Sequence, residues 1–214
     1  MSHIVVLGGT GYAGSAIAKE AVARGHRVTV VARHGPSAPT EGATYIEGSA
    51  TDDDVVNGAI GDSDILVVAL APRGALAGKL RPLARHIAEL ARTAGIRLGV
   101  VGGAGSLLSA PGGPRILQTR GFPAAVKPEA AEMAGVLDDL RASPQDLDWF
   151  MLSPAIEFGA HAPGEALGAY REGGDFPVTD DDGRSEISGP DFALAFVDEI
   201  ERPAHSRQRF TVAH

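Results

Sequence analysis

Cysteine is absent from the 214-residue sequence, aromatic residues make up only 5% of it, and no apolar run is long. Without cysteine the chain can form no disulfide, no thiolate nucleophile and no zinc site with thiolate ligands. No run approaches the ~18 apolar residues of a membrane span, and the N-terminus lacks the basic region and apolar stretch of a secretion signal. We therefore expect a cytoplasmic protein that does not bind membranes.

Positive charge is also scarce. The chain carries 19 Lys and Arg against 27 Asp and Glu, which gives a formal net charge of −8. Nucleic-acid affinity depends on Lys and Arg that neutralise many phosphates, so DNA or RNA is not expected as a partner. The seven histidines show no spacing typical of metal ligands, and no metal site is expected. We expect a small-molecule partner, bound by a monomer or a homodimer.

Short β-branched runs alternate with amphipathic segments from residue 3 to about residue 103, which is the pattern of βαβ units. We therefore predict an α/β fold, a Rossmann-type doubly wound parallel sheet. The expected strands cover residues 3–7, 27–32, 44–48, 64–70, 97–103, 147–152 and 207–213. The expected helices cover residues 15–25, 52–60, 78–95, 129–141 and 188–201, the last with Ser188 as its N-cap.

The regular pattern weakens after residue 104. Residues 106–128 are rich in glycine and proline and predict an irregular loop, and long loops in compact domains are usually functional. The chain shows no internal repeat and no linker, so we expect a single domain, residues 1–214.

Three glycines at fixed spacing separate the first expected strand from the first helix. The motif G-x-x-G-x-x-G lets the backbone turn tightly and lie against a phosphate, while the helix N-terminus points its free N–H groups at the anion. Glycines also mark plain turns, but this triplet has the strand before it and the amphipathic helix after it. The predicted dinucleotide loop consists of Gly8, Thr10, Gly11, Tyr12, Ala13 and Gly14.

The end of the second strand indicates which dinucleotide binds. NAD-binding units usually place Asp or Glu there, about 20 residues after the glycines, to accept from the ribose hydroxyls. No acid occurs between Val28 and Pro39, whereas Arg33 and His34 follow the strand. A guanidinium suits a 2′-phosphate, so NADP(H) is expected in preference to NAD(H). The alternative is that Arg33 only extends into solvent at a strand end.

Ligands of an open parallel sheet bind outside the carboxyl ends of its strands, which assigns further contacts. The fourth and fifth strands end near the expected nicotinamide ribose, at Ala69, Leu70, Ala71, Pro72, Gly102 and Gly103. Where a second ligand would lie beside the nicotinamide, we expect Phe122 and Pro123 to form an apolar wall. Lys127 could donate a proton from the irregular loop unless it is only solvated, and His161 could reach the mouth of the pocket.

Four stretches carry a resemblance to a known family: TGYAGSAIAKEAVARGHRVTVVAR, VVGGAGSL, LDWFMLSPA and ISGPDFALAFVDEIERPAHSRQRFTVAH. Together they resemble the atypical short-chain dehydrogenases/reductases that bind NAD(P)H. The closest likeness is to a group of proposed NADH-flavin reductases related to biliverdin reductase B, with NmrA-like regulators as more distant relatives. The resemblance covers nearly the whole chain. It implies one NAD(P)-binding Rossmann domain, residues 1–214, with a small substrate-side region at about residues 154–188, before the last helix and strand. It also implies hydride transfer to a flavin or another planar acceptor.

The resemblance also assigns individual residues. Ser106 resembles the active-site Ser or Thr that follows the fifth strand, and is the catalytic candidate; the alternative is a helix or loop cap. Ser49 and Ala50 follow the third strand, where related proteins carry an acidic residue beside the adenine, so that acceptor is missing here. The residues that resemble those flanking the nicotinamide are Pro154, Ala155 and Ile156.

Short-chain dehydrogenases that reduce carbonyls share a Tyr-x-x-x-Lys pair, which this chain lacks. No Lys lies four residues after Tyr12, Tyr45 or Tyr170. An alcohol dehydrogenase or sugar epimerase needs a positioned acid or base for the hydroxyl proton, whereas a flavin mainly needs its ring oriented. We therefore expect hydride transfer from NADPH to a flavin or quinone-like acceptor. The alternatives are a non-enzymatic NmrA-like redox sensor and a dedicated reductase or isomerase of a biosynthetic pathway.

Overall fold

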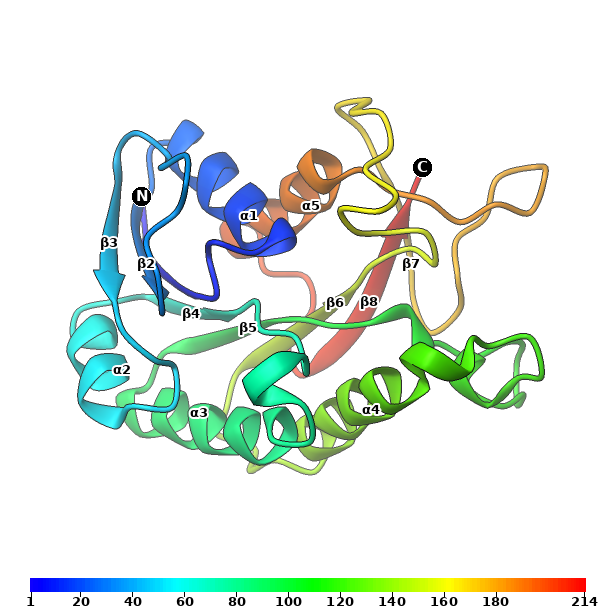
Figure 1. Ribbon diagram of the computed structural model, residues 1–214, viewed down its shortest axis with the longest axis horizontal. Coiled ribbons are helices and arrows are strands. Elements are labelled where there is room, and N and C mark those ends of the chain that lie inside the picture. Colours follow the sequence, from blue (N-terminus) through cyan, green and yellow to red (C-terminus); the bar gives the residue numbers. More distant parts are fainter.

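The computed structural model describes all residues, 1–214, and shows one eight-stranded sheet with helices on both faces (Figure 1). Its strands lie in the order β3-β2-β1-β4-β5-β6-β8-β7. Neighbouring strands run parallel, except that β7 pairs antiparallel with β8. From β1 the chain steps outward to β2 and β3 and then crosses to β4 on the other side of β1. This order confirms the predicted Rossmann-type doubly wound sheet.

The bounds of the elements follow the predicted alternation. The strands are β1 (His3–Leu7), β2 (Arg27–Ala32), β3 (Ala43–Glu47), β4 (Ile65–Val68), β5 (Arg97–Val101), β6 (Trp149–Ser153), β7 (Arg171–Gly173) and β8 (Gln208–Ala213). The α-helices are α1 (Tyr12–Ala23), α2 (Asp53–Ile60), α3 (Leu80–Ala94), α4 (Lys127–Arg141) and α5 (Gly189–Glu201). No helix is both long and apolar enough to cross a membrane.

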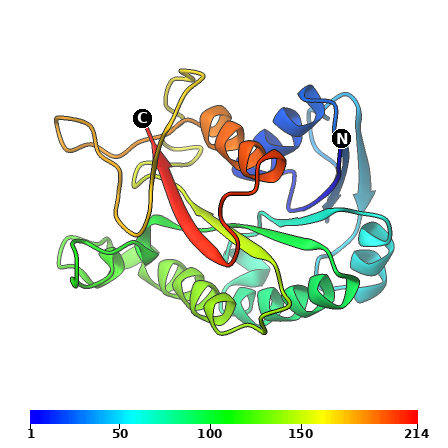
Figure 2. The ribbon, with the colours of Figure 1, turned by 180° about the vertical axis from the view of Figure 1, so that it is seen from behind.

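Helices α1 and α5 cover one face of the sheet, and α2, α3 and α4 cover the other (Figure 1 and Figure 2). Strand β1 contributes to both layers because side chains alternate along a strand. Ile4 and Val6 are buried in the core under α1 and α5, whereas Val5 and Leu7 are buried in the core on the opposite face. Each face has its own core, which explains why the strand is an uninterrupted apolar run.

The structure differs from the prediction mainly where elements begin. Helix α1 begins at Tyr12 rather than at residue 15, because Gly11 already serves as its N-cap with an extended backbone (φ −78°, ψ 171°). Helix α4 begins at Lys127, which is therefore a helical residue and not part of the irregular loop. Strand β7 has no counterpart in the sequence prediction, since three residues are too few to show an alternating pattern.

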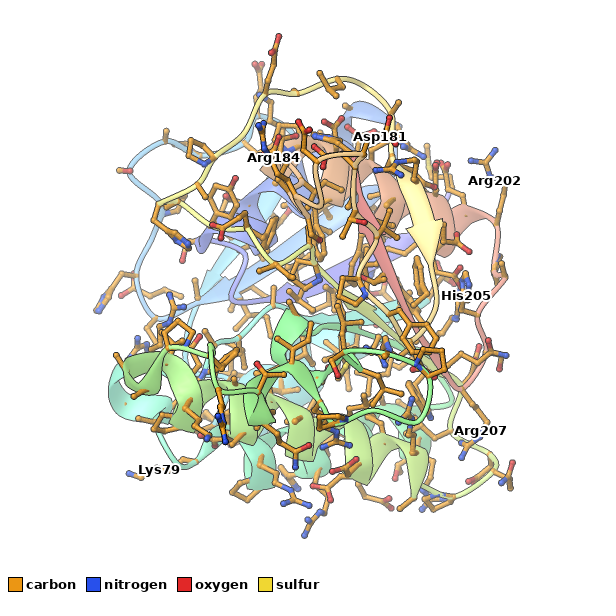
Figure 3. All side chains as sticks on the ribbon, turned by 90° about the vertical axis from the view of Figure 1, so that its right-hand side faces the viewer. Lys79, Asp181, Arg184, Arg202, His205 and Arg207 are labelled. Atoms are coloured by element: carbon orange, nitrogen blue, oxygen red, sulfur yellow. The ribbon has the colours of Figure 1, made fainter.

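Two irregular segments lie at one end of the molecule. Residues 104–126 contain only short 3-10 turns, and residues 154–188 contain only β7 as regular structure. Both lie on the right-hand side of Figure 1. Seen from that side, the first segment lies with the lower helical layer and the second with the upper layer of α1 and α5 (Figure 3). The carboxyl ends of β5 and β6 lead into these two segments.

Aromatic side chains are few but concentrated. Most of the seven phenylalanines pack together between the sheet and α5, as a cluster of Phe150, Phe158, Phe192, Phe196 and Phe210. Gly99 in the middle of β5 leaves room for them. A Cβ atom at this position would lie 2.7 Å from Cζ of Phe150 and 3.0 Å from Cζ of Phe196. The core under α1 and α5 therefore requires a residue without a side chain at position 99.

We expect Gly99→Val to lower the free energy of unfolding by ~1–3 kcal/mol, because the added side chain overpacks the buried phenylalanine cluster. Urea unfolding followed by far-UV circular dichroism measures this change. The control is Gly58→Ala, since Gly58 lies in α2 with open space around its Cα, and there Ala should stabilise by ~0.5–1 kcal/mol. Equal effects of the two substitutions would contradict the packing argument.

Candidate dinucleotide and acceptor site

The glycine loop between β1 and α1 brings two backbone segments into contact. Gly8 has a positive φ of 82°, its N–H donates to the carbonyl of Val31 at 3.0 Å, and its carbonyl accepts from Gly11 N–H at 3.0 Å. A Cβ on Gly8 would lie 2.6 Å from the carbonyl oxygen of Ala69, and one on Gly14 would lie 2.4 Å from the carbonyl oxygen of Gly8. Glycine is required at both positions by geometry.

The first turn of α1 presents unused hydrogen-bond donors. The N–H groups of Thr10, Tyr12 and Ala13 donate to no carbonyl, whereas the helical ladder begins with Ser15 N–H to Gly11 at 2.8 Å. No acidic residue lies in this turn. Free N–H groups and the positive end of the helix dipole favour an anion, so the loop has the chemistry of a pyrophosphate site.

Arg33 and His34 follow β2 and are both exposed. Most arginines of this chain pair with carboxylates, but Arg33 has no ionic or hydrogen-bonded partner, so its guanidinium is available to a ligand. A small cavity of about 140 Å³ at the end of β2 is lined by His34, Tyr45 and Glu47 among others, but not by Arg33. Glu47 was not predicted as a site residue. The register places it opposite Ala32, so the neighbouring strand brings a carboxylate to the end of β2.

The residues after β3 form a local turn. Ser49 Oγ accepts a hydrogen bond from Thr51 N–H at 3.1 Å and lies 2.7 Å from Thr51 Oγ1. Ser49 and Ala50 are half-buried. The Ser49 hydroxyl is therefore engaged within its own turn, and a contact between this turn and an adenine ring stays a prediction.

The end of β4 packs closely against the glycine loop, whereas the end of β5 packs against β6 and α4. Ala69 and Leu70 are half-buried, and a Cβ on Gly8 would lie 2.9 Å from Cδ2 of Leu70. Ala71 is exposed, but Pro72 is buried and has little surface to offer an acceptor. Beyond β5, a Cβ on Gly102 would lie 2.9 Å from Met151 Cγ and from Ser153 Oγ, whereas Gly103 is half-buried with more room.

Ser106 lies in a 3-10 turn, Ala104–Ser106, directly after β5. Its side chain is buried, and its hydroxyl donates to the carbonyl of Gly103 at 2.9 Å. The hydroxyl hydrogen is thus used in a local bond within the 3-10 turn, which differs from the N-cap bond, in which the side-chain oxygen accepts from a backbone N–H. A role for Ser106 toward an acceptor stays a prediction.

The remaining acceptor-side residues differ in how they are placed. The Phe122 ring is half-buried, with Cζ 3.5 Å from where a Cβ on Gly105 would lie, so it packs at the end of β5. Pro123 and Lys127 are exposed, and Lys127 makes no hydrogen bond. His161 is exposed and folds back over its own turn, with its ring 2.9 Å from the Cβ position of Gly159.

Exposed apolar side chains concentrate in the two irregular segments. Pro154 and Ala155 are buried at the end of β6, but the next residue, Ile156, is 47% exposed. Apart from Met1, the exposed large apolar side chains are Val126, Ile156, Leu167 and Phe176. All four come from residues 104–126 or 154–188. The end of the molecule beyond β5 and β6 therefore offers apolar surface to a ligand.

The buried carboxylate of Asp191 fastens the substrate-side region to α5. It accepts from the N–H groups of Leu167 and Gly168 at 2.8 and 2.9 Å, from Ser188 Oγ at 2.7 Å and lies 2.8 Å from His214 Nε2. Burial alone would raise the pKa of Asp191, but these hydrogen bonds outweigh burial and hold the pKa below its usual value. Asp191 was not predicted as a site residue; the signal that points to it is its position three residues after Ser188, the N-cap of α5.

A cavity of about 580 Å³ lies apart from the predicted site. It lies between α3 and α4, with Ala88, Val136 and Leu140 among its lining residues, and includes none of the predicted site residues. The structure also brings together no group of three or more His, Asp or Glu side chains that could hold a metal ion.

We expect Asp191→Asn to lower the free energy of unfolding by about 2 kcal/mol at pH 7, because Leu167 and Gly168 donate to different carboxylate oxygens, and in Asn one of these becomes an NH2 group that cannot accept. Since the folded pKa of Asp191 is depressed, its stabilisation is present above the unfolded pKa of about 3.9 and is lost as pH falls through the folded value. Urea unfolding of both proteins between pH 6 and pH 3 should show the difference shrinking toward acid pH.

The matched control is Asp181→Asn, in the exposed outer loop of the same region, where Figure 3 shows Asp181 near Arg184. This substitution should change stability by less than about 0.5 kcal/mol. A difference between Asp191→Asn and the unaltered protein that stays constant down to pH 3 would contradict the assigned role of the ionised carboxylate.

Residues 8–203 match the model of a family described as NAD(P)H-binding. Among solved structures, the chain is 37% identical to a protein of Burkholderia pseudomallei named as a proposed exported protein. The TM-score is 0.87, and both chains are covered completely.

Two further solved structures are similar over the whole chain. The chain is 33% identical to a proposed NADH-flavin reductase of Streptococcus pneumoniae, with a TM-score of 0.83 and complete coverage of both chains. It is 31% identical to a proposed epimerase of Bacteroides thetaiotaomicron, with a TM-score of 0.88, over all of this chain and 97% of the other. The names of these relatives agree on no single activity, so the reaction must be argued from the site.

Proposed function

Because this chain belongs to the NAD(P)H-binding family, we propose that it is a reductase that transfers hydride from NADPH to a flavin or quinone-like planar acceptor. The likeness to atypical short-chain dehydrogenases/reductases that the sequence indicates is confirmed by this membership and by the solved relatives. The choice of NADPH and of the acceptor rests on the residues of the site.

The glycine loop supports the binding of a dinucleotide. The free N–H groups of Thr10, Tyr12 and Ala13 would hold the pyrophosphate, and glycine at positions 8 and 14 lets the backbone approach it closely. Bound NADPH would supply the hydride with its electron pair, and solvent would supply the proton that completes reduction of the acceptor. The chain's own task is then to bind and orient two rings.

We propose a planar acceptor because no acid or base is fixed in position by the protein where the substrate would lie. The Tyr-x-x-x-Lys pair is missing, the hydroxyl hydrogen of Ser106 is committed to Gly103, and Lys127 and His161 are exposed without partners. An epimerase needs a positioned group to move a hydroxyl proton. Hydride transfer between stacked rings does not, and Phe122 and Ile156 offer apolar contact to such a ring.

The experiment that tests the reductase follows NADPH absorbance with the purified protein and a panel of FMN, FAD, riboflavin, biliverdin and simple quinones, with NADH as the comparison. Turnover with at least one planar acceptor is the expected result. If calorimetry shows that NADPH binds but no acceptor is reduced, the proposal fails and the redox-sensor alternative takes its place.

NADPH is proposed in preference to NADH because Arg33 and His34 are exposed at the end of β2 and Arg33 has no carboxylate partner. We expect Arg33→Asp to weaken NADPH binding ~10-fold or more, because a charge-assisted hydrogen bond to the 2′-phosphate is lost and a negative charge replaces it. NADH affinity should change by no more than about twofold. Isothermal calorimetry with both dinucleotides measures these affinities.

Arg120→Asp is the matched control, since Arg120 is an exposed arginine without an ionic partner, and its substitution changes the net charge equally. It should leave both affinities nearly unchanged. Equal losses of NADPH and NADH binding in Arg33→Asp would contradict the assignment.

Glu47→Gln tests the carboxylate of β3. A gain in NADPH affinity in this variant would mean that Glu47 repels the 2′-phosphate.

A further inference from the structure

Tyr12 joins the glycine loop to the substrate-side region. We propose that Tyr12 is a positioning residue, through which a dinucleotide bound at the backbone of the loop orders residues 158–163 beside the acceptor. The proposal rests on the proposed binding of NADP(H), and it concerns the side chain of a residue whose predicted role involved the loop alone.

The Tyr12 hydroxyl makes two hydrogen bonds to distant parts of the chain. It donates to the carbonyl of Pro163 at 3.2 Å and accepts from Gly189 N–H at 3.0 Å. Gly189 is the first residue of α5, where N–H groups have no partner within the helix. One hydroxyl therefore satisfies the start of α5 and holds the substrate-side region at the same time.

The ring of Tyr12 also makes close contacts with distant parts of the chain. It meets the Phe158 ring edge-on, with centroids 5.2 Å apart and an interplanar angle of 70°. Phe158 in turn packs on Phe192 of α5, with centroids 4.6 Å apart. A Cβ on Gly189 would lie 3.0 Å from the Tyr12 ring, so the absence of a side chain there makes room for the phenol.

Residues 158–163 depend on this contact more than their neighbours do. Within this turn the other backbone hydrogen bond is internal, from Ala162 N–H to Gly159 at 3.0 Å. The bond from Tyr12 to Pro163 is the hydrogen bond that ties the turn to another element, and the packing of Phe158 on α5 adds an apolar contact. The following residues have separate attachments, because Asp191 holds Leu167 and Gly168.

The backbone and the side chain of Tyr12 have different partners. Its backbone N–H belongs to the unused donors of α1, and its side chain packs against the substrate-side region. A pyrophosphate that fixes the backbone of Tyr12 also fixes the phenol, which lowers the conformational freedom of residues 158–163. Such coupling is reciprocal, so an ordered turn must favour the dinucleotide by the same factor.

The test measures hydrogen exchange of peptides that cover residues 158–168, with and without saturating NADP⁺, in the unaltered protein, Tyr12→Phe and Tyr170→Phe. Tyr170→Phe is the matched control: it also removes a phenolic hydroxyl from this part of the molecule, but that hydroxyl donates to Asp198 of α5 at 2.8 Å. NADP⁺ should slow exchange about fivefold in the unaltered protein and in Tyr170→Phe, and by less than twofold in Tyr12→Phe.

Calorimetry on the same samples distinguishes failure of the coupling from failure of the proposed function. The NADP⁺ affinity of Tyr12→Phe should fall by no more than about fivefold, because the backbone N–H remains. If the unaltered protein binds NADP⁺ but its exchange does not slow, or slows equally in Tyr12→Phe, the coupling is overturned while the proposed function stands. Failure of the unaltered protein to bind NADP⁺ overturns both.

A second variant keeps the test decisive if Tyr12→Phe does not fold. Phe158→Leu removes the aromatic contact from the other side and leaves the glycine loop unchanged. It should lose the NADP⁺-dependent slowing in the same peptides. Retention of the full fivefold slowing in Phe158→Leu would overturn the proposal.

Discussion

The contact between the carbonyl of Gly8 and the Cα of Gly14 is the constraint on which the rest of the site depends. A Cβ at Gly14 would lie 2.4 Å from that oxygen, so only glycine lets α1 start this close to the end of β1. This approach places the unused N–H groups of Thr10, Tyr12 and Ala13 directly after the carboxyl end of β1. It also sets the direction in which the Tyr12 side chain leaves the helix. The glycine triplet therefore determines the geometry of the glycine loop and of the contact between Tyr12 and the substrate-side region.

The substrate-side region has little regular structure, and specific contacts hold it instead. Asp191 gathers the N–H groups of Leu167 and Gly168, and Tyr12 holds the carbonyl of Pro163. Both attachments lead to the start of α5, whose Ser188 cap lies beside them. A segment held at a few polar points can shift when one point moves, whereas a packed sheet cannot. One domain thus combines a closely packed glycine loop with a region that is held at a few polar points.

The sequence predicts the fold well because the relevant signals are local. Strand β1 is apolar at every position after His3 because it is buried on both faces, and the helix between β1 and β2 shows its amphipathic period. The site is predicted less completely, because its contacts join residues far apart in the chain. Glu47 reaches the end of β2 only through the register of β3, and nothing near Tyr12 indicates that its hydroxyl meets Gly189. Strand β7 is missed for a third reason: it is formed by pairing with β8 and is too short to have a pattern of its own.

The two outer strands have a consequence for how copies of this protein could meet. At one edge, β3 has five residues with Thr44 and Glu47 exposed, and at the other, β7 has three residues, of which Arg171 and Glu172 are exposed and charged. Short edge strands with charged side chains pair poorly with a strand from another molecule, since few backbone groups are open and the charges must be desolvated. Both edges of the sheet are therefore unfavourable for pairing with a strand of another copy.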